Sequence, residues 1–496
     1  MEDMAKTLRD CLAEYPRIML EAIAEGWGIS FTDERTPEIV ARLATEMADA
    51  EALRIVLQRL SDVEREALAF VASTGQVKAH VMVRRYGPIR HLGPGRLEWE
   101  QAWQQPASAT ERLWFLGLIH RGYGMDEHYH GEVFFIPPEI QNVLPPLPVR
   151  LPVFAVEPAS QPSVVRDDQD AFTRDAFVIL SYLRNYEVRT KMGVLAPRVL
   201  TQLRPRLIYP ADQKRLQFLH HLCKQTGLIR REEELWKPTS IAASWLKEGA
   251  IARCRTFYHA WLEDANWNEL WMMPGVHCED TGWRNDPVLA RKGMLNHLLK
   301  CPTDTWLTVA SLVGSMHEMD PDFMRPDGDY NSWYIRDAKT GQYLMGYGAW
   351  EKVEGAWIRY LLEGPLLWLG VVATGYRQGE QQASCFMLTT YGAAILGLRE
   401  IQEAPPQPIV VQPNFQVLVP HSASWYDRFL VERFAHWMDE QNRITRYAIQ
   451  ADSVRTCLAS GVTWKQILAF LRRVTGNQVP NSVQRALQSW AKADRL

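Results

Sequence analysis

The stretch Leu113-Trp-Phe-Leu-Gly-Leu-Ile119 decides the fold, because its pattern recurs at Gly227-Leu-Ile229 and at Gly370-Val-Val372. In each copy an amphipathic helix ends at a glycine and an aliphatic pair follows. A hairpin comes next, and its second strand ends in apolar residues. Glycine can adopt the left-handed conformation that closes the last turn of a helix, and the aliphatic pair then begins a strand. A helix followed by a strand hairpin is the second half of a winged helix, so the repeat predicts three winged-helix-like modules.

Helices are also predicted upstream of each copy, as a winged helix requires. In the first copy Ser61-x-x-Glu64 forms a capping box that opens a helix over residues 62–73, and Ser108-x-x-Glu111 opens the third helix of the module. The helices of the second and third copies are predicted over residues 171–185, 196–204, 216–222, 287–299, 309–319 and 353–362. Generic α+β packing with coincidental glycine placement is the alternative interpretation.

Length and composition limit the class of protein. The chain has 496 residues, and single hydrophobic cores rarely grow past roughly 250 residues. No stretch offers the about 20 apolar residues that a membrane-spanning helix needs, and the first residues lack an apolar signal core. Seven scattered cysteines without a C-x-x-C pair argue against a disulfide framework and a zinc ribbon. We therefore expect a cytoplasmic, multidomain protein that needs no cofactor.

Two proline-containing stretches are predicted to join the domains. Residues 144–162 are dense in proline, which fixes φ and has no N–H, so this stretch should be extended rather than packed. The predicted fold class is α+β, predominantly helical, with tandem winged-helix-like modules plus a small α/β C-terminal domain. The predicted order is a helical segment at 1–60, module 1 at 61–143, a linker at 144–168, module 2 at 169–262, module 3 with a hairpin insertion at 263–402, a linker at 403–408 and the last domain at 409–496.

The last domain has the most readable pattern. Strands are predicted in Ile409-Val-Val-Gln-Pro413, in Phe415-Gln-Val-Leu-Val419 and over residues 444–449. An amphipathic helix is predicted over residues 425–438 between them. Short helices should follow over residues 453–459, 464–474 and 482–491, and the last two should be capped by Thr463-x-x-Gln466 and Asn481-x-x-Gln484.

Several segments of this domain occur together in one order: the first two strands, Tyr447-Ala-Ile449 with Ser453-Val454, Gly461-Val-Thr-Trp464 with Ile467-Leu468, and Val479-Pro-Asn-Ser-Val483 with Trp490. With them the domain resembles the auxiliary domain that accompanies XPB-type DNA helicases and that also occurs in bacterial helicase-associated proteins. The upstream chain is similar to large bacterial members of that group at Arg85-Tyr-Gly-Pro-Ile-Arg90, Gly93-Pro-Gly-Arg-Leu97, Gly282-Trp-Arg-Asn-Asp-Pro287, Asp320-Pro-Asp-Phe323, Arg325-Pro-Asp-Gly-Asp-Tyr330 and Ser332-Trp-Tyr-Ile-Arg-Asp337. The resemblance implies an association with DNA and no defined activity.

No catalytic residue and no metal ligand is predicted. The chain has no G-x-x-x-x-G-K-[ST] loop to bind phosphates and no DEAH-type run to hold magnesium, so a partner must carry out any strand separation. His128-Tyr-His130 is assigned to the tip of the first wing, where a solvated loop is expected. His277-Cys-Glu-Asp280 mixes soft and hard ligands without a second cluster and is also assigned to a loop.

A nuclease site is the one enzymatic alternative that remains. Asp322 and the later Asp337-Ala-Lys339 fit the loose PD…D-x-K pattern, in which two carboxylates hold a metal. However, residues 337–341 lie between two apolar stretches and end in Gly341, which can supply the positive φ of a tight turn. The hairpin turn is therefore the favoured interpretation.

Positive charge is concentrated toward the C-terminal end. The whole chain has a formal net charge of −3, but residues 406–496 contain eleven Lys and Arg against six Asp and Glu. This segment therefore carries +5 and the remainder −8, which favours a polyanionic partner for the basic end. The candidate phosphate-contacting residues are Arg455, Arg472, Arg473 and Arg485 in the last domain, and Arg90 and Arg96, with Arg84 and Arg85, in the first module. Their alternative role is to complement helix dipoles.

These observations favour a non-catalytic adaptor that binds duplex or forked DNA and acts with a separate helicase or DNA-processing protein. No membrane partner is expected. A protein–protein scaffold, in which the winged-helix-like modules are docking units without nucleic acid, is the second hypothesis. A metal-dependent nuclease at Asp322 and Asp337 is the third.

Overall fold

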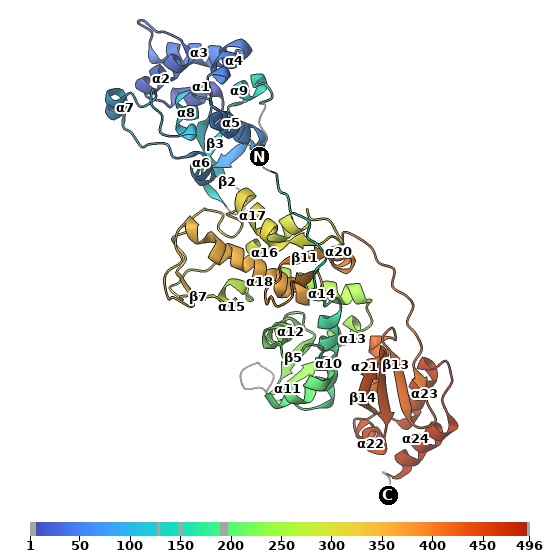
Figure 1. Ribbon diagram of the computed structural model, residues 1–496. Coiled ribbons are helices and arrows are strands. Elements are labelled where there is room, and N and C mark those ends of the chain that lie inside the picture. Colours follow the sequence, from blue (N-terminus) through green and yellow to red (C-terminus); the bar gives the residue numbers. More distant parts are fainter. Residues whose placement is uncertain (1–5, 126–128, 148–150, 152, 189–196, 494–496) are drawn as a thin grey trace.

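The computed structural model describes residues 6–125, 129–147, 151, 153–188 and 197–493. As predicted, the protein is an α+β molecule made mainly of helices, with small antiparallel sheets. Its described residues form three buried apolar clusters, which we call the cores of the N-terminal body (8–147), the middle body (154–396) and the C-terminal body (409–490); the middle cluster also includes Trp425 and Phe429 of the C-terminal body. The N-terminal and C-terminal bodies lie at opposite ends of an elongated molecule (Figure 1).

The N-terminal body consists of four helices followed by a winged-helix-like unit. Its elements are α1 Leu8–Ala13, α2 Arg17–Trp27, α3 Thr36–Met47, α4 Ala50–Gln58, α5 Asp62–Thr74, β1 Gln76–Lys78, α6 Ala79–Tyr86, α7 Pro94–Glu100, α8 Ala109–Phe115, β2 His120–Met125, β3 His130–Phe135 and α9 Pro138–Val143.

The winged-helix-like unit runs helix, strand, helix, helix, hairpin. Its sheet has the order β1-β3-β2, so the last strand of the hairpin returns to pair with the first strand. The predicted capping box at Ser61 is present, since Ser61 and Glu64 each accept the other's backbone N–H. Gly117 has a φ of 64° after α8, as the repeat predicted. Helices α1–α4 share the core of this unit, so residues 6–60 are part of the same body.

The middle body contains two more units of this kind. Its elements are β4 Val164–Arg166, α10 Ala171–Asn185, α11 Pro197–Leu203, η1 Arg204–Arg206, α12 Gln213–Gln225, β5 Ile229–Glu232, β6 Leu235–Pro238, α13 Ser240–Trp245, α14 Ala250–Leu262, α15 Glu269–Met272, β7 Val276–Cys278, α16 Pro287–Leu298, β8 Leu307–Thr308, α17 Val309–Met319, β9 Ile335–Asp337, η2 Tyr347–Ala349, η3 Glu351–Gly355, α18 Ala356–Glu363, α19 Pro365–Trp368, β10 Val372–Tyr376, β11 Cys385–Leu388 and α20 Thr390–Ile395.

The two units differ in how completely their sheets form. The unit of α10, α11 and α12 has the hairpin β5-β6, and Trp236 of β6 donates its N–H to the Val188 carbonyl at 3.2 Å. The unit of α16, α17 and α18 has three strands in the order β8-β11-β10, the same connectivity as in the N-terminal body. Gly227 and Gly370 have φ values of 70° and 76°. Both units pack into one continuous core.

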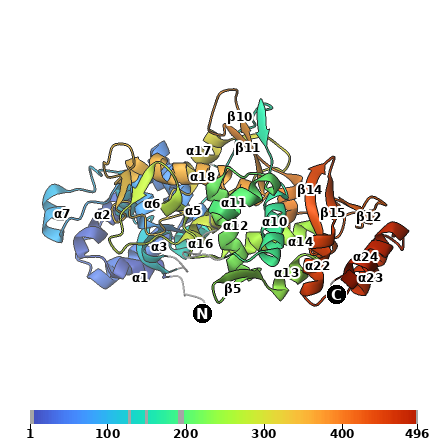
Figure 2. The same ribbon diagram turned by 90° about the horizontal axis from the view of Figure 1, so that it is seen from below.

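The proline-dense stretch is extended, but from Phe154 onward it packs against the third unit. Ala159 donates its N–H to the Trp306 carbonyl, and Thr308 donates to the Glu157 carbonyl. Further along, β4 pairs antiparallel with β10 and becomes the edge strand of the sheet β4-β10-β11-β8 (Figure 2). The prediction of an unpacked linker is therefore wrong for this part, because free N–H and C=O groups between the prolines complete exposed strand edges.

The C-terminal body is a four-stranded antiparallel sheet, in the order β12-β13-β15-β14, followed by three helices. Its elements are β12 Val410–Val411, β13 Gln416–Pro420, α21 Trp425–Val431, β14 Ala435–Gln441, β15 Ile444–Ile449, α22 Ala451–Ala459, α23 Trp464–Val474 and α24 Asn481–Ala493. The helix predicted over residues 425–438 is wrong in its second half, where β14 pairs with β15. The capping box at Thr463 is present.

Candidate nucleic-acid interface

The third helix of a winged helix enters the DNA major groove in proteins that read DNA this way, so it must be exposed for such a role. In the N-terminal body this helix is α8, and Thr110, Glu111, Leu113 and Phe115 are all buried. Its other side faces the preceding helices, where the Trp114 indole N–H donates to the Tyr15 hydroxyl at 3.1 Å. Helix α8 is therefore an interior helix of this body.

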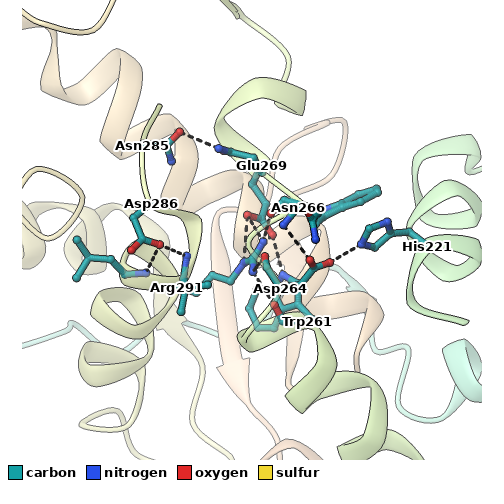
Figure 3. Close-up of polar contacts among 12 residues, drawn as sticks. His221, Trp261, Asp264, Asn266, Glu269, Asn285, Asp286 and Arg291 are labelled. Carbon is teal, nitrogen blue, oxygen red and sulfur yellow. Dashed lines mark hydrogen bonds and ion pairs between the residues drawn. The ribbon is translucent and has the colours of Figure 1, made fainter. Parts of the chain in front are cut away.

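The third helix of the second unit, α12, is held between two units. Phe218, Leu219 and Leu222 point into the shared core. On a second side, His221 contacts the carboxylate of Asp264 in the loop after α14 (Figure 3). The equivalent helix of the third unit, α18, also buries most of its length, including Trp357. Among the described residues, α8 is interior and α18 is half buried, whereas α12 keeps an exposed polar stripe that includes Lys214, Gln217 and Lys224.

A buried polar network explains why the second and third units are fixed to each other. The fully buried Arg291 of α16 donates to both carboxylate oxygens of Glu269 and to the carbonyls of Trp261 and Asp264 at 2.6 and 2.7 Å (Figure 3). The Trp261 indole donates to the same Glu269 carboxylate at 2.7 Å. Because Asp264 also binds His221, the network runs continuously from α16 to α12.

The arginines predicted in the first module mostly bind acidic side chains. Arg90 donates from Nε to both carboxylate oxygens of the buried Glu111, at 2.9 and 3.0 Å. Burial alone would raise the pKa of Glu111, but hydrogen bonds from Arg90 and from the Ala107 N–H lower it. Arg96 pairs with Glu100 within α7, at 2.5 Å, and stays largely exposed. Arg90 thus positions a loop, and only Arg96 is open to a ligand.

Arg84 and Arg85 lie on α6, which faces the middle body. Arg84 donates two hydrogen bonds to Asp322, at 2.9 and 2.7 Å, and its guanidinium lies 4.8 Å from the centre of the Tyr347 ring. The guanidinium of Arg85 lies 4.8 Å from the centre of the Phe70 ring. Arg84 therefore belongs to the contact between bodies, whereas Arg85 packs on an aromatic ring of its own body.

The arginines predicted in the last domain are more accessible. Arg455 on α22 and Arg485 on α24 are exposed, and neither forms a hydrogen bond or ion pair with the described residues. Arg472 on α23 is exposed and donates only to the Gln484 amide oxygen, at 3.0 Å, which brings it beside Arg485 in the packed pair α23 and α24. We call Arg455, Arg472 and Arg485 the C-terminal arginine set. Arg473 differs, because it forms a two-pronged pair with Asp427.

Other charges of the C-terminal body are largely neutralised. Arg446 pairs with Asp439 on the neighbouring strand. Buried Arg428 lies 3.8 Å from Glu440 and donates to the Tyr447 hydroxyl. The positive excess of this body therefore resides mainly in the C-terminal arginine set and a few other exposed side chains.

The proposed nuclease residues have other partners. Asp322 accepts hydrogen bonds from Arg84, from His80 at 3.1 Å and from the Tyr330 hydroxyl at 2.6 Å. Asp337 accepts from the backbone N–H groups of Lys339 and Thr340, as in the predicted hairpin turn. A metal would have to displace those donors from both carboxylates, so the geometry does not favour a shared metal site.

The histidine-containing motifs also form no ligand cluster. His277 and Cys278 lie in β7, paired with β9, so their assignment to a loop is wrong. The following Glu279 binds Arg336 and Tyr343. His128 lies outside the described residues, whereas His130 lies in β3. Among the described residues, no group of three or more His, Cys, Asp or Glu side chains could hold a metal ion.

The contact between the second unit and the C-terminal body was not predicted. Trp425 and Phe429 of α21 pack edge-on against Phe177 of α10. Arg206 pairs with Glu432 across the contact at 2.5 Å. Only the large aromatic residues on one face of residues 425–431 could have signalled a docking helix.

None of the helices formed by the described residues is long and apolar enough to cross a membrane. Comparisons of the sequence with protein-family models and with curated proteins found no match. Proposals about function therefore rest on the residues and geometry described above.

Proposed function

We propose that this chain is a non-catalytic DNA-binding adaptor that acts with a separate helicase or other DNA-processing protein. The observation that supports it is the C-terminal arginine set, whose exposed guanidinium groups lack carboxylate partners among the described residues. Guanidinium groups recognise phosphate through paired N–H donors, and such contacts position a protein on DNA without reading its sequence.

The charge distribution supports the same assignment. The segment that holds this set carries +5, while the rest of the chain carries −8. The acidic remainder should repel DNA, so binding should occur end-on through the C-terminal body, leaving the N-terminal and middle bodies free for a protein partner. The resemblance to an auxiliary domain of DNA helicases is consistent with this division.

The test is a fluorescence anisotropy titration of the full chain with blunt duplex, forked and single-stranded DNA at several salt concentrations. Replacing Arg455, Arg472 and Arg485 together with Gln should weaken binding to all three DNAs. It should also reduce the slope of log K against log salt by roughly one for each lost phosphate contact. The control variant replaces Arg9, Arg230 and Arg377, which are exposed arginines of the other bodies, with Gln.

The control removes the same net charge, so it should change the binding far less. Equal weakening by both triple variants would show a general charge effect and contradict a specific C-terminal interface. Absence of binding at the lowest salt concentration would contradict DNA binding altogether.

A protein–protein scaffold is the second candidate, because the third helix of the first unit, α8, is interior and α18 is half buried, so these two helices cannot enter a DNA groove. The first wing also exposes Tyr123 and Met125, at 69% and 74%. If the chain binds no DNA, and replacing Tyr123 and Met125 with Ser removes a cross-linked partner, the scaffold is the function.

A further inference from the structure

A pocket of about 420 Å³ lies at the contact between the second winged-helix-like unit and the C-terminal body. One wall is the end of α10, with Ser181, Tyr182 and Tyr186. The opposite wall comes from β14 and α22, with His436 and Thr456. Because two bodies build it, the pocket exists only while they are docked. A volume in this range fits one small ligand or one nucleotide rather than a folded partner.

An aromatic platform lines this pocket. The rings of Tyr182 and Tyr186 stack with centroids 4.6 Å apart and planes 30° from parallel. The Tyr182 hydroxyl is held by the Gln202 side chain. Tyr186 remains 55% exposed, so its stacked partner fixes it while much of the ring stays accessible. A preorganised tyrosine of this kind can stack a nucleobase at little cost in side-chain entropy.

Positive side chains stand beside the platform. Arg433 lines the pocket and donates to the Ser460 hydroxyl at 3.1 Å. Arg206 also lines it and uses one terminal nitrogen on Glu432, the acidic residue of the lining. His436 lies 3.3 Å from Asp452. Behind the wall, burial and, after it, the positive charge of Arg433 lower the pKa of Arg184 to about 10.

Two polar atoms of the lining have no partner among the described residues. The hydroxyl of Ser181, a fully buried residue, and Nε of Arg206 form no hydrogen bond although both atoms are buried. Leaving a buried donor unpaired is energetically unfavourable. Both atoms lie beneath the pocket surface, so the groups that a ligand can reach are the exposed ring of Tyr186 and the side chain of Arg433.

We propose that this pocket holds one unpaired nucleotide of a DNA strand, with the base stacked on Tyr186 and a phosphate on Arg433. The proposal deepens the DNA-binding function above and rests on it. Helix α22 connects the two sites, because Thr456 lines the pocket and the adjacent Arg455 belongs to the C-terminal arginine set. A strand that leaves the pocket along α22 passes Arg455, the member of that set on this helix. The protein would therefore prefer forked DNA, whose arms offer unpaired bases, over blunt duplex.

The experiment uses the full chain and a forked DNA with 2-aminopurine in its single-stranded arm. Stacking on tyrosine should quench the probe, and Tyr186→Ala should abolish the quenching and weaken fork binding by about 5- to 150-fold, the range for one stacked base. Tyr186→Phe should keep both, since it keeps the ring. Arg433→Gln should weaken fork binding, and Tyr334→Ala, at an exposed tyrosine of the middle body, should change nothing.

The outcomes separate the pocket from the arginine set. Loss of fork preference in Tyr186→Ala, with blunt-duplex binding unchanged, supports the pocket. Equal affinity of wild type and Tyr186→Ala for the fork, with duplex binding intact, overturns the pocket and leaves the proposed function standing. Quenching by a single-stranded probe without any duplex binding supports the pocket and contradicts the arginine interface. Competition by free dAMP as strong as by the strand would assign the pocket to a free nucleotide and overturn the strand proposal.

Discussion

Arg84 of the N-terminal body and Asp322 of the middle body form a two-pronged ion pair, with hydrogen bonds of 2.9 and 2.7 Å. The sequence placed these residues in two different candidate sites, one for phosphate and one for a metal. In the structure these two side chains bind each other, so neither is open to a phosphate or a metal. His80 and Tyr330 complete the hydrogen bonding of the carboxylate, so the pair is a joint between bodies.

Asp322→Asn should weaken the contact between the N-terminal and middle bodies. The carboxylate is mostly buried, and removing one partner of such a pair leaves Arg84 uncompensated, at a cost of about 3 kcal/mol. Small-angle scattering should show a larger radius of gyration. Asp337→Asn is the control, because an asparagine oxygen can still accept the turn's N–H groups. Identical scattering profiles for Asp322→Asn and wild type would contradict the joint.

The same contact should depend on acid pH. Burial would raise the pKa of Asp322, but hydrogen bonds from His80, Arg84 and Tyr330 lower it to about 2. Because the pKa of Asp322 is lower in the folded than in the unfolded protein, the ionised carboxylate stabilises the folded state at pH values above the ordinary pKa of 3.8. This stabilisation is lost as the pH falls from about 4 to about 2. The wild-type radius of gyration should therefore rise over this window, whereas Asp322→Asn should show no such step.

Arg291→Lys should destabilise the middle body by about 3–5 kcal/mol, measured by urea unfolding. Lysine keeps the charge but cannot reach both oxygens of Glu269 and two carbonyls at once. Lys292→Arg, at the neighbouring exposed position, should leave stability unchanged. A loss below about 1 kcal/mol in Arg291→Lys would mean that the buried network does not hold the units together.

Gly370→Ala should be more damaging than Gly397→Ala. Both glycines have positive φ, at 76° and 79°, so each change strains the backbone by about 1–2 kcal/mol. At Gly370, however, the added Cβ would lie 2.3 Å from the Gln169 carbonyl oxygen, whereas nothing lies within 4 Å at Gly397. An extra loss of about 1–3 kcal/mol is expected for Gly370→Ala in thermal unfolding. Equal losses would contradict this close approach.

Limited proteolysis should cut first within residues 397–408, which are exposed throughout. A glutamate-specific protease should therefore cut first at Glu400, because Glu403 is held by the Ala250 and Ile251 N–H groups, and a denaturing gel should show the C-terminal body as a separate fragment. Residues 154–166 should resist, because their backbone is paired with the third unit. Early cleavage in that stretch, before the 397–408 cut, would contradict its docking.

Sequence patterns predicted the helices and the glycine turns that depend on neighbouring residues in the chain. Each repeat glycine takes positive φ, and the predicted helices of the second and third units appear within a few residues. The helix predicted over residues 425–438 is only half correct, because a helical periodicity in the first half changes to a strand periodicity in the second. Trp425 and Phe429 follow a helical spacing, but from Ala435 buried and exposed residues alternate, and pairing with β15 decides the structure.

The candidate site was harder to predict, because charge partners are distant in the chain. Nothing near Arg90 shows that Glu111 will engage its guanidinium, or that Arg84 will meet Asp322. The exposure of Arg455 and Arg485 could be predicted because their surroundings are local helix surface. The pocket at Tyr186 forms only where two bodies dock, and the hydrophobic periodicity of neither body predicts that contact.

The edge strand β4 has a consequence for how the chain is made. Its partner β10 lies far downstream, with the whole second unit between them, so that unit is an insertion within the third. On the ribosome, β4 emerges early and must wait, unpaired, until β10 is synthesised. Long-range pairing of this kind is slow and leaves an apolar edge open to other chains. The middle body should therefore complete its fold only late in translation, and truncated chains ending before residue 372 should aggregate.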